Sequence, residues 1–273
     1  MEKMYLLRKI LLISLVLVLF SCEKEDFLSN DIDQTARQNE ITAKNVAGKT
    51  FQGENVPVGS GFVFSWVTFN NYGTLMEVGI DITPEVYESL PRSGDFEKPL
   101  IIPFSEDVKK FIPFNHVGLN WSNGNPENPL LTKPHFDVHF FMITVEQRME
   151  IPEFSDESEA LFTNYPSAEH FPSGYKPFAK NSRAEAMIGN HWYPTKALKT
   201  SDYALFLGSY DGKFTFLDPM VSLDFLKNES LLISEEIPQP AIYPSDKDFP
   251  KYFNIYTNKK KNNSITLSTF IQR

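Results

Sequence analysis

The sequence predicts a mostly β protein with a single compact domain, either barrel-like or sandwich-like, over residues 48–273. Segments rich in β-branched and aromatic residues recur throughout this range, and such residues favour strands. Turn signals separate the segments, for example at residues 70–73 and at Asp211-Gly212, a dipeptide typical of β-hairpins. The sequence has no heptad pattern, no long amphipathic helix and no repeat of about 20 to 50 residues. We therefore expect short helices only in the connections between strands.

The same signals predict the individual elements. Thr83, Pro84 and Glu85 supply a capping residue, a helix-starting proline and a first-turn acid, which together indicate a short helix over residues 83–90. The strongest strand signal covers residues 135–145, and a tight, ordered turn is expected around His191. The other predicted strands are 59–69, 74–82, 98–104, 111–119, 204–210, 213–217, 252–257 and 264–271, the other helical turns are 146–150, 155–161 and 222–227, and residues 121–129 are expected to form a loop.

The first residues have the pattern of an export signal. Lys3, Arg8 and Lys9 precede an apolar run over residues 10–20. This run is too short to span a bilayer as a stable helix, which needs roughly 20 apolar residues, and has the length of a signal-peptide core. We therefore expect residues 1–21 to be removed from the mature protein.

The cleavage region resembles that of a bacterial lipoprotein. Ser21 and Cys22 follow the apolar run directly, although Phe20 departs from the small or β-branched residue usual there. Cys22 is the only cysteine, so no intramolecular disulfide can form. The sequence predicts that Cys22 carries a lipid that binds the protein to a membrane. An ordinary signal peptide followed by an incidental cysteine is the alternative.

Residues 22–47 are polar and lack apolar periodicity, which predicts a flexible tether between the lipid and the domain. The acidic residues at 23–26 resemble surface-export signals of some Gram-negative lipoproteins, and a solvated linker is the alternative. The expected location is the cell envelope, as an outer-membrane lipoprotein that faces either the periplasm or the cell surface.

The charge pattern excludes one class of function. The net charge is −9, and the only basic run, at residues 259–261, precedes two asparagines and reads as a turn. Nucleic-acid binding needs clustered basic residues, so we expect no nucleic-acid partner.

Chemistry is concentrated in one predicted strand. Side chains alternate between the two faces of a strand, so His135, Asp137 and His139 project to one side, and the apolar residues between them project to the core. Imidazole and carboxylate are preferred ligands of zinc, iron, manganese and copper. The pattern predicts a mononuclear site for one of these metals, and a hydrogen-bonded polar patch is the alternative.

The strand cannot complete such a site alone. Same-face neighbours lie roughly 7 Å apart, whereas a metal–nitrogen bond is about 2.1 Å. Another segment must therefore contribute a ligand. His191 is the first candidate, His116 the second and His170, in a loop rich in proline and serine, the third. Asp137 would be a ligand or would orient an imidazole.

Other catalytic motifs are absent from the sequence. It contains no Gly-x-Ser-x-Gly elbow, no Gly-x-Gly-x-x-Gly loop and no phosphate loop. Cys22 cannot act as a nucleophile if it is lipidated. The sequence therefore leaves open whether the protein is an enzyme.

The segments FNHVGLNW at 114–121, PHFDVHF at 134–140 and MIGNHW at 187–192 carry a resemblance that covers about residues 50–230. They resemble an uncharacterised bacterial family of secreted or lipid-anchored proteins, a domain of unknown function. The resemblance implies a compact β-rich fold, assembly of some members into rings and therefore a homo-oligomer, and a shared site at the positions of His116, His135, His139 and His191.

The chain departs from this family pattern at two positions. Glu127 lies in a loop where similar proteins tend to have a histidine, so that it would replace this ligand or leave a weaker site. Asp218 stands where similar proteins tend to have glutamate. Three hypotheses remain: a metal-binding envelope lipoprotein, a non-catalytic module that binds a ligand or partner, and an assembly protein whose edge strands pair between subunits.

Overall fold

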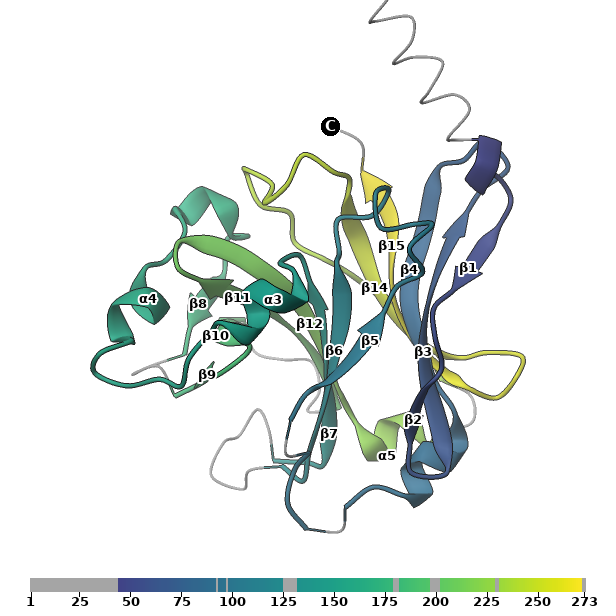
Figure 1. Ribbon diagram of the computed structural model, residues 1–273, viewed down its shortest axis with the longest axis horizontal. Coiled ribbons are helices and arrows are strands. Elements are labelled where there is room, and N and C mark those ends of the chain that lie inside the picture. The colour runs from purple at the N-terminus through teal and green to yellow at the C-terminus, as the bar shows by residue number, and fades with distance from the viewer. Residues whose placement is uncertain are drawn as a thin grey trace, which may run out of the picture. The chain divides into compact units, whose positions relative to one another are not determined.

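The computed structural model describes residues 44–91, 93–96, 98–124, 132–178, 182–196, 202–228 and 231–271. The expectations for the signal peptide, for Cys22 and for most of the tether lie outside these residues. A compact unit of the chain begins at Gly48. The fold described below is that of this unit. The unit is mostly β, which confirms the predicted fold class, and its strands form two antiparallel sheets (Figure 1).

Each sheet has a simple order of strands among the described residues. In the first sheet the order is β1 (Thr50–Gln52), β3 (Gly61–Phe69), β4 (Leu75–Ile82), β15 (Asn263–Ile271), β14 (Phe249–Thr257) and β13 (Leu232–Glu236), with β2 (Val56–Val58) paired to β3. In the second sheet the order is β5 (Leu100–Pro103), β6 (His116–Ser122), β7 (His135–Phe141), β12 (Lys213–Ser222), β11 (Tyr203–Tyr210), β10 (Gly189–Pro194) and β8 (Tyr175–Pro177), with β9 (Ala184–Glu185) paired to β10.

The helices are short and lie in connections, as predicted. They are η1 (Pro84–Glu88), α3 (Val145–Met149), α4 (Glu159–Thr163), η2 (Ala168–His170) and α5 (Leu223–Leu226). The helix expected over residues 83–90 is a shorter 3-10 helix, η1, and the side chain of Thr83 makes no capping bond. By contrast, Thr144 and Gln147 form a reciprocal capping box at the start of α3.

The apolar core lies between the sheets and follows the alternation of the strands. Along β3, Val63, Ser65 and Val67 are buried, and the residues between them are partly or fully exposed. On β7, Phe136 and Phe140 are both fully buried, and Phe136 packs against Tyr87 beside the first sheet, with ring centroids 6.3 Å apart. The apolar residues of β7 therefore face the core, as predicted.

The opposite face of the second sheet is also covered, because the chain that follows β7 folds back over it. Figure 1 shows α3 and α4 on the side of the second sheet away from β3 and β4. In this cover, Arg148 of α3 donates from Nε to the carbonyl of Met187 at 2.8 Å, and Ile188 packs against Phe141 and Phe216. Polar side chains on this outer face of the second sheet are consequently buried rather than exposed to solvent.

Two predicted elements differ in the structure in ways that affect the site. His191 lies on β10, a strand paired with β11, β8 and β9, and not in the expected turn. The strand predicted over residues 213–217 continues to Ser222 and so includes Asp218. β10 pairs with strands that precede and follow it closely in the chain, whereas β12 also pairs with β7, which is distant in sequence. Residue propensities alone reveal neither pairing. No helix among the described residues is long and apolar enough to cross a membrane.

Candidate metal centre

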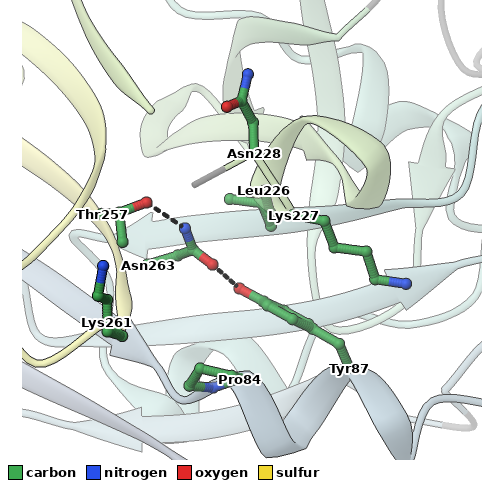
Figure 2. A pocket seen from close by; sticks show the side chains of 8 residues that line it. All are labelled: Pro84, Tyr87, Leu226, Lys227, Asn228, Thr257, Lys261 and Asn263. Carbon is green, nitrogen blue, oxygen red and sulfur yellow. Dashed lines mark hydrogen bonds between the residues drawn. The ribbon is translucent and has the colours of Figure 1, made fainter. Parts of the chain in front are cut away.

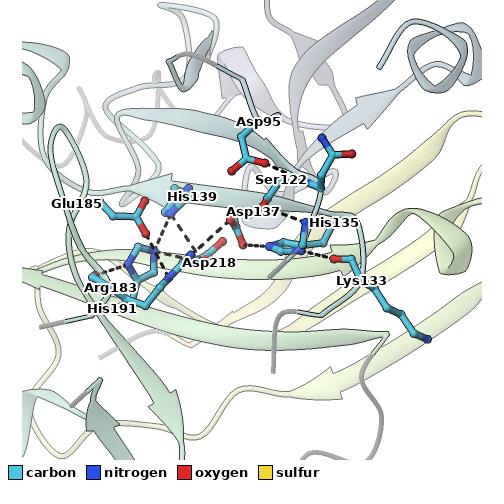
Figure 3. Close-up of polar contacts among 12 residues, drawn as sticks. Asp95, Ser122, Lys133, His135, Asp137, His139, Arg183, Glu185, His191 and Asp218 are labelled. Atoms are coloured by element: carbon cyan, nitrogen blue, oxygen red, sulfur yellow. Dashed lines mark hydrogen bonds and ion pairs between the residues drawn. The ribbon is translucent and has the colours of Figure 1, made fainter. Parts of the chain in front are cut away.

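Three buried side chains from three strands meet on the outer face of the second sheet (Figure 3). His139 lies on β7, His191 on β10 and Asp218 on β12. The Nε2 atoms of the two histidines are 3.1 Å apart, and each lies 3.8 Å from Oδ2 of Asp218. All three side chains are at most 1% exposed. This cluster could hold a metal ion.

The strand register explains why these residues converge. Pairing of Phe216 with Phe141 and of Met220 with Asp137 brings Asp218 beside His139 on the same face of β12 and β7. His191 approaches from across β11, where its partner is Gly208. The ligand set is therefore assembled by sheet topology rather than by a continuous sequence motif.

The triangle of ligand atoms has the size that a metal requires. Given the three distances between these atoms, the point equidistant from both Nε2 atoms and Oδ2 lies about 2.1 Å from each. This is the usual length of a metal–nitrogen or metal–oxygen bond to zinc.

Hydrogen bonding prepares the imidazoles to act as ligands. Nδ1 of His191 donates to the carbonyl of Arg183 at 2.9 Å, so the lone pair of the neutral ring is on Nε2 and faces the cluster. On His139, the backbone of Gly118 raises the pKa of the ring slightly against the effect of burial, and Nδ1 has no hydrogen-bond partner among the described residues. With both protons on Nδ1, two nitrogen lone pairs and a carboxylate face one another.

A purely hydrogen-bonded interpretation leaves buried atoms without partners. A hydrogen bond between Nε2 of His139 and Nε2 of His191 would still leave the carboxylate of Asp218 without a hydrogen-bond donor. Both oxygens of Asp218 are buried and have no hydrogen-bond partner among the described residues. Buried polar groups are nearly always paired because each unpaired group costs about 1–3 kcal/mol. A cation would satisfy Asp218 and both imidazoles together.

The electrostatics of the cluster are consistent with this assignment. Burial, and then the charge of the other imidazole, lower the pKa of His139 well below its ordinary value, and burial followed by Arg183 lowers that of His191. Both rings are therefore neutral near pH 7, the form that binds metal. Burial, and then the charge of Asp137, raise the pKa of Asp218 well above its ordinary value. A bound cation would counter this effect by stabilising the carboxylate.

The structure places His135 and Asp137 beside the cluster rather than in it. The His135 ring is held by a 2.6 Å contact between Nδ1 and the Lys133 carbonyl, and its Nε2 lies 3.7 Å from Oδ1 of Asp137. Arg183 forms ion pairs with Asp137 at 3.7 Å and Glu185 at 3.2 Å. Burial opposes the charge of Arg183, but Glu185 and then Asp137 raise its pKa overall.

His116 is directed elsewhere. Its Nε2 accepts a hydrogen bond from Nη1 of the buried Arg148 at 3.3 Å, and its Nδ1 contacts Oδ1 of Asn115 at 3.1 Å. Both ring nitrogens are thus engaged, and the structure does not bring His116 to the cluster. His170 lies in η2, where its Nδ1 contacts the hydroxyl of Ser167 at 2.8 Å. Glu127 lies outside the described residues.

Asp218 is the ligand that sequence reasoning left out of the metal site. One signal was present: Asp218 is the only ionisable residue in the otherwise apolar or hydroxyl-bearing run at 214–221. A lone carboxylate inside a run typical of a buried strand needs a partner. Because Asp218 is far from His139 in the sequence, the sequence alone did not identify His139 as this partner.

A separate pocket lies between η1, α5 and the turn joining β14 to β15 (Figure 2). Its volume is about 400 Å³, and Tyr87, at its edge, donates to Oδ1 of Asn263 at 2.5 Å. Asn263 in turn donates to Thr257 at 3.2 Å. The pocket is lined by Pro84, Tyr87, Leu226, Lys227, Asn228, Thr257, Lys261 and Asn263, none of which belongs to the histidine cluster.

The comparisons with known proteins gave no relative: no family model, no curated protein and no solved structure matches the chain.

Proposed function

We propose that this protein is an envelope lipoprotein whose β-rich domain binds a divalent transition metal through His139, His191 and Asp218. The observation that carries the metal assignment is the fully buried carboxylate of Asp218. Neither of its oxygens forms a hydrogen bond of normal geometry among the described residues, although a backbone contact with Val138 lowers its pKa in part, and Oδ2 lies 3.8 Å from Nε2 of each histidine.

The donor set narrows the chemistry. Two imidazoles and one carboxylate are the protein ligands of several catalytic zinc sites and of non-haem iron sites. Three protein ligands leave at least one coordination position for water or a substrate. A metal bound there would act as a Lewis acid or lower the pKa of a bound water. The protein supplies fixed imidazole tautomers and a site shielded from bulk solvent.

The envelope location rests on the N-terminal sequence. A basic start, a short apolar run and Cys22 as the only cysteine support lipid attachment after removal of residues 1–21. The polar stretch that follows, residues 23–43, would give the domain freedom to move relative to the membrane.

Elemental analysis of the mature chain, purified from membranes in detergent, tests the metal proposal. We expect bound zinc, iron, manganese or copper, and a loss of about one equivalent per chain in His191→Ala and in Asp218→Asn. His170→Ala is the matched control, because its ring contacts the hydroxyl of Ser167 and lies outside the cluster. A wild-type protein that holds no transition metal, even after incubation with each of these ions, would contradict the proposal.

A non-catalytic binding module is the second candidate, and the pocket beside Tyr87 is the observation that favours it. Two lysines and the side chains of Asn228 and Asn263 line this pocket, a combination suited to a small anionic ligand. Native mass spectrometry would detect such a ligand in the wild-type protein. Its retention in a Lys227→Ala/Lys261→Ala variant would exclude this role for the pocket.

A further inference from the structure

A second group of buried acceptor atoms lies next to the candidate metal centre. His135 and Asp137 have side chains only 2% and 6% exposed. Nε2 of His135 and Oδ1 of Asp137 both lack a hydrogen-bond partner among the described residues, although they face each other at 3.7 Å. This distance exceeds the 2.7–3.2 Å of a hydrogen bond, yet it suits two atoms that bind one ion at about 2.1 Å.

The orientation of His135 sets the chemistry of this gap. Its Nδ1 lies 2.6 Å from the carbonyl of Lys133, an acceptor only, so Nδ1 carries a proton. In the neutral ring, Nε2 then presents a lone pair to the carboxylate of Asp137. In a protonated ring, Nε2–H would donate to Asp137, and we would expect a contact near 2.8 Å rather than 3.7 Å.

Asn120 adds a third acceptor from the neighbouring strand. In the register of β6 and β7, Asn120 is the direct partner of Asp137, so both side chains project to the same face. Oδ1 of Asn120 is buried and has no hydrogen-bond partner among the described residues. Three buried acceptor atoms on one face of two adjacent strands thus lack a hydrogen-bond partner among the described residues.

We propose that His135, Asp137 and Asn120 bind a second divalent cation, next to the one held by His139, His191 and Asp218. An imidazole nitrogen, a carboxylate oxygen and an amide oxygen form a mixed set suited to manganese or zinc. A cation satisfies all three acceptors at once, whereas one added proton would satisfy only a single pair.

Local charge favours cation binding at this place. Asp137, Asp218 and Glu185 contribute three carboxylates, and Arg183 is the one lysine or arginine that pairs with them among the described residues, so negative charge is in excess. The charge of Asp137 also raises the pKa of Asp218, and Figure 3 shows the two carboxylates beside each other.

The ligand atoms proposed for the second site differ from those of the first, which belongs to the proposed function, so the two sites can be tested separately. The mature chain in detergent is stripped with a chelator and titrated with Mn²⁺ and, separately, with Zn²⁺, and bound metal is counted by elemental analysis after desalting. We expect about two equivalents in wild type, about one in His135→Ala, about one in His191→Ala and none in the double variant. His170→Ala should keep two.

Each result has a defined meaning. One equivalent in wild type that is kept in His135→Ala and lost in His191→Ala would overturn the second site and leave the proposed function standing. One equivalent lost only in His135→Ala would overturn the proposed function and support the second site. Two equivalents in His135→Ala would also overturn the second site.

Two substitutions of Asn120 with opposite expected effects distinguish loss of the second site from misfolding of the protein. Asn120→Asp adds a charge to the second site and should tighten its affinity about tenfold, whereas Asn120→Leu, of similar volume, should remove the second equivalent. In Mn²⁺-loaded wild type, electron paramagnetic resonance should show magnetic coupling between two ions, and this coupling should vanish in Asn120→Leu. Equal affinity in both Asn120 variants would contradict the assignment.

Discussion

The phenyl ring of Phe216 lies over the backbone of Gly208, where a methyl group at position 208 would come within 2.0 Å of Cε1 of the ring. From this position, the ring contacts His139 and His191, with centroid distances of 4.8 Å and 5.1 Å. The absence of a side chain at Gly208 therefore allows Phe216 to form an apolar wall against both imidazoles of the candidate metal centre.

We predict that Gly208→Ala destabilises the protein by about 1–3 kcal/mol, because the added methyl overlaps the ring and forces Phe216 to move. The displaced ring would also shift the two imidazoles, so metal affinity should fall at least tenfold. Urea denaturation and a metal titration measure the two effects.

A double-mutant cycle identifies the cause. Phe216→Ala alone should cost about 3–5 kcal/mol through loss of buried contacts. Adding Gly208→Ala to that variant should then cost little, because the overlap is gone. If the cost of Gly208→Ala is the same with and without the Phe216 ring, the steric explanation is wrong.

Stability of the metal-free protein should decline below about pH 6.5, the ordinary pKa of histidine. Burial, and then the charge of Arg148, lower the pKa of His116 to about 3, and those of His139 and His191 are lowered as well. Below about pH 6.5, these histidines therefore bind protons in the unfolded chain but stay neutral in the folded protein. The contribution of each histidine to the free energy of unfolding is fully present above about pH 6.5 and is lost as the pH falls towards the pKa of that histidine in the folded protein. The loss is at most about 1.4 kcal/mol per pH unit for each histidine.

Urea unfolding at pH 7 and pH 5 measures this dependence. His116→Gln removes one titrating group and should show a smaller loss of stability on acidification than wild type. His170→Gln, outside the buried group, should behave like wild type. An equal loss in all three proteins would show that His116 is not held neutral by the fold.

Replacement of Arg148 by methionine should raise the pKa of His116. Arg148 is buried, stacks on Phe141 at 4.5 Å and donates to His116 and to the carbonyl of Met187. Without its charge, the pKa of His116 moves up but stays below 6.5, because burial is the larger cause of its shift. We also expect a stability loss of about 1–3 kcal/mol from the unpaired carbonyl of Met187.

Nuclear magnetic resonance titration of the histidine rings gives this pKa directly. Lys109→Met is the comparison, because the charge of Lys109 lowers the pKa of His116 less than that of Arg148 does. A larger shift in Lys109→Met than in Arg148→Met would contradict the geometry of the pair.

The proposed lipid attachment requires Cys22. We predict that Cys22→Ser blocks cleavage before residue 22 and leaves a longer chain without lipid. Intact-mass spectrometry and detergent partitioning distinguish the two forms. Ser21→Thr, which keeps the cysteine, is the control. A Cys22→Ser protein of mature mass that still partitions into detergent would exclude the lipoprotein assignment.

Local sequence patterns were sufficient for the strands that form the core. β3, β4, β7, β11 and β15 all appear close to their predicted bounds because each has strong strand propensity and clear turn signals. The alternation along β7 also predicted correctly that its histidines and Asp137 share one face, while Phe136 faces the core. This is a local property that depends only on strand geometry.

Two members of the cluster, His139 and His191, were predicted from the sequence, but Asp218 was not, and the sequence did not show which of the five predicted ligands would meet. His191 and Asp218 reach His139 through cross-strand register, and the pairing of β12 with β7 joins segments far apart in sequence. The short edge strands β1, β2, β8 and β9 were missed for a related reason: two or three residues carry too little propensity to be recognised alone.

The order of strands in the second sheet also constrains when the candidate centre can form. β12 lies between β7 and β11, and β11 lies between β12 and β10, so the three candidate ligands come together only when β7, β12, β11 and β10 are all paired. A nascent chain that has reached β10 still lacks Asp218 and the sheet that carries it. Metal uptake would consequently be one of the last events of folding, slow because it depends on contacts distant in sequence. An ion would bind only to chains in which the second sheet is complete, and its binding would stabilise that sheet against unfolding.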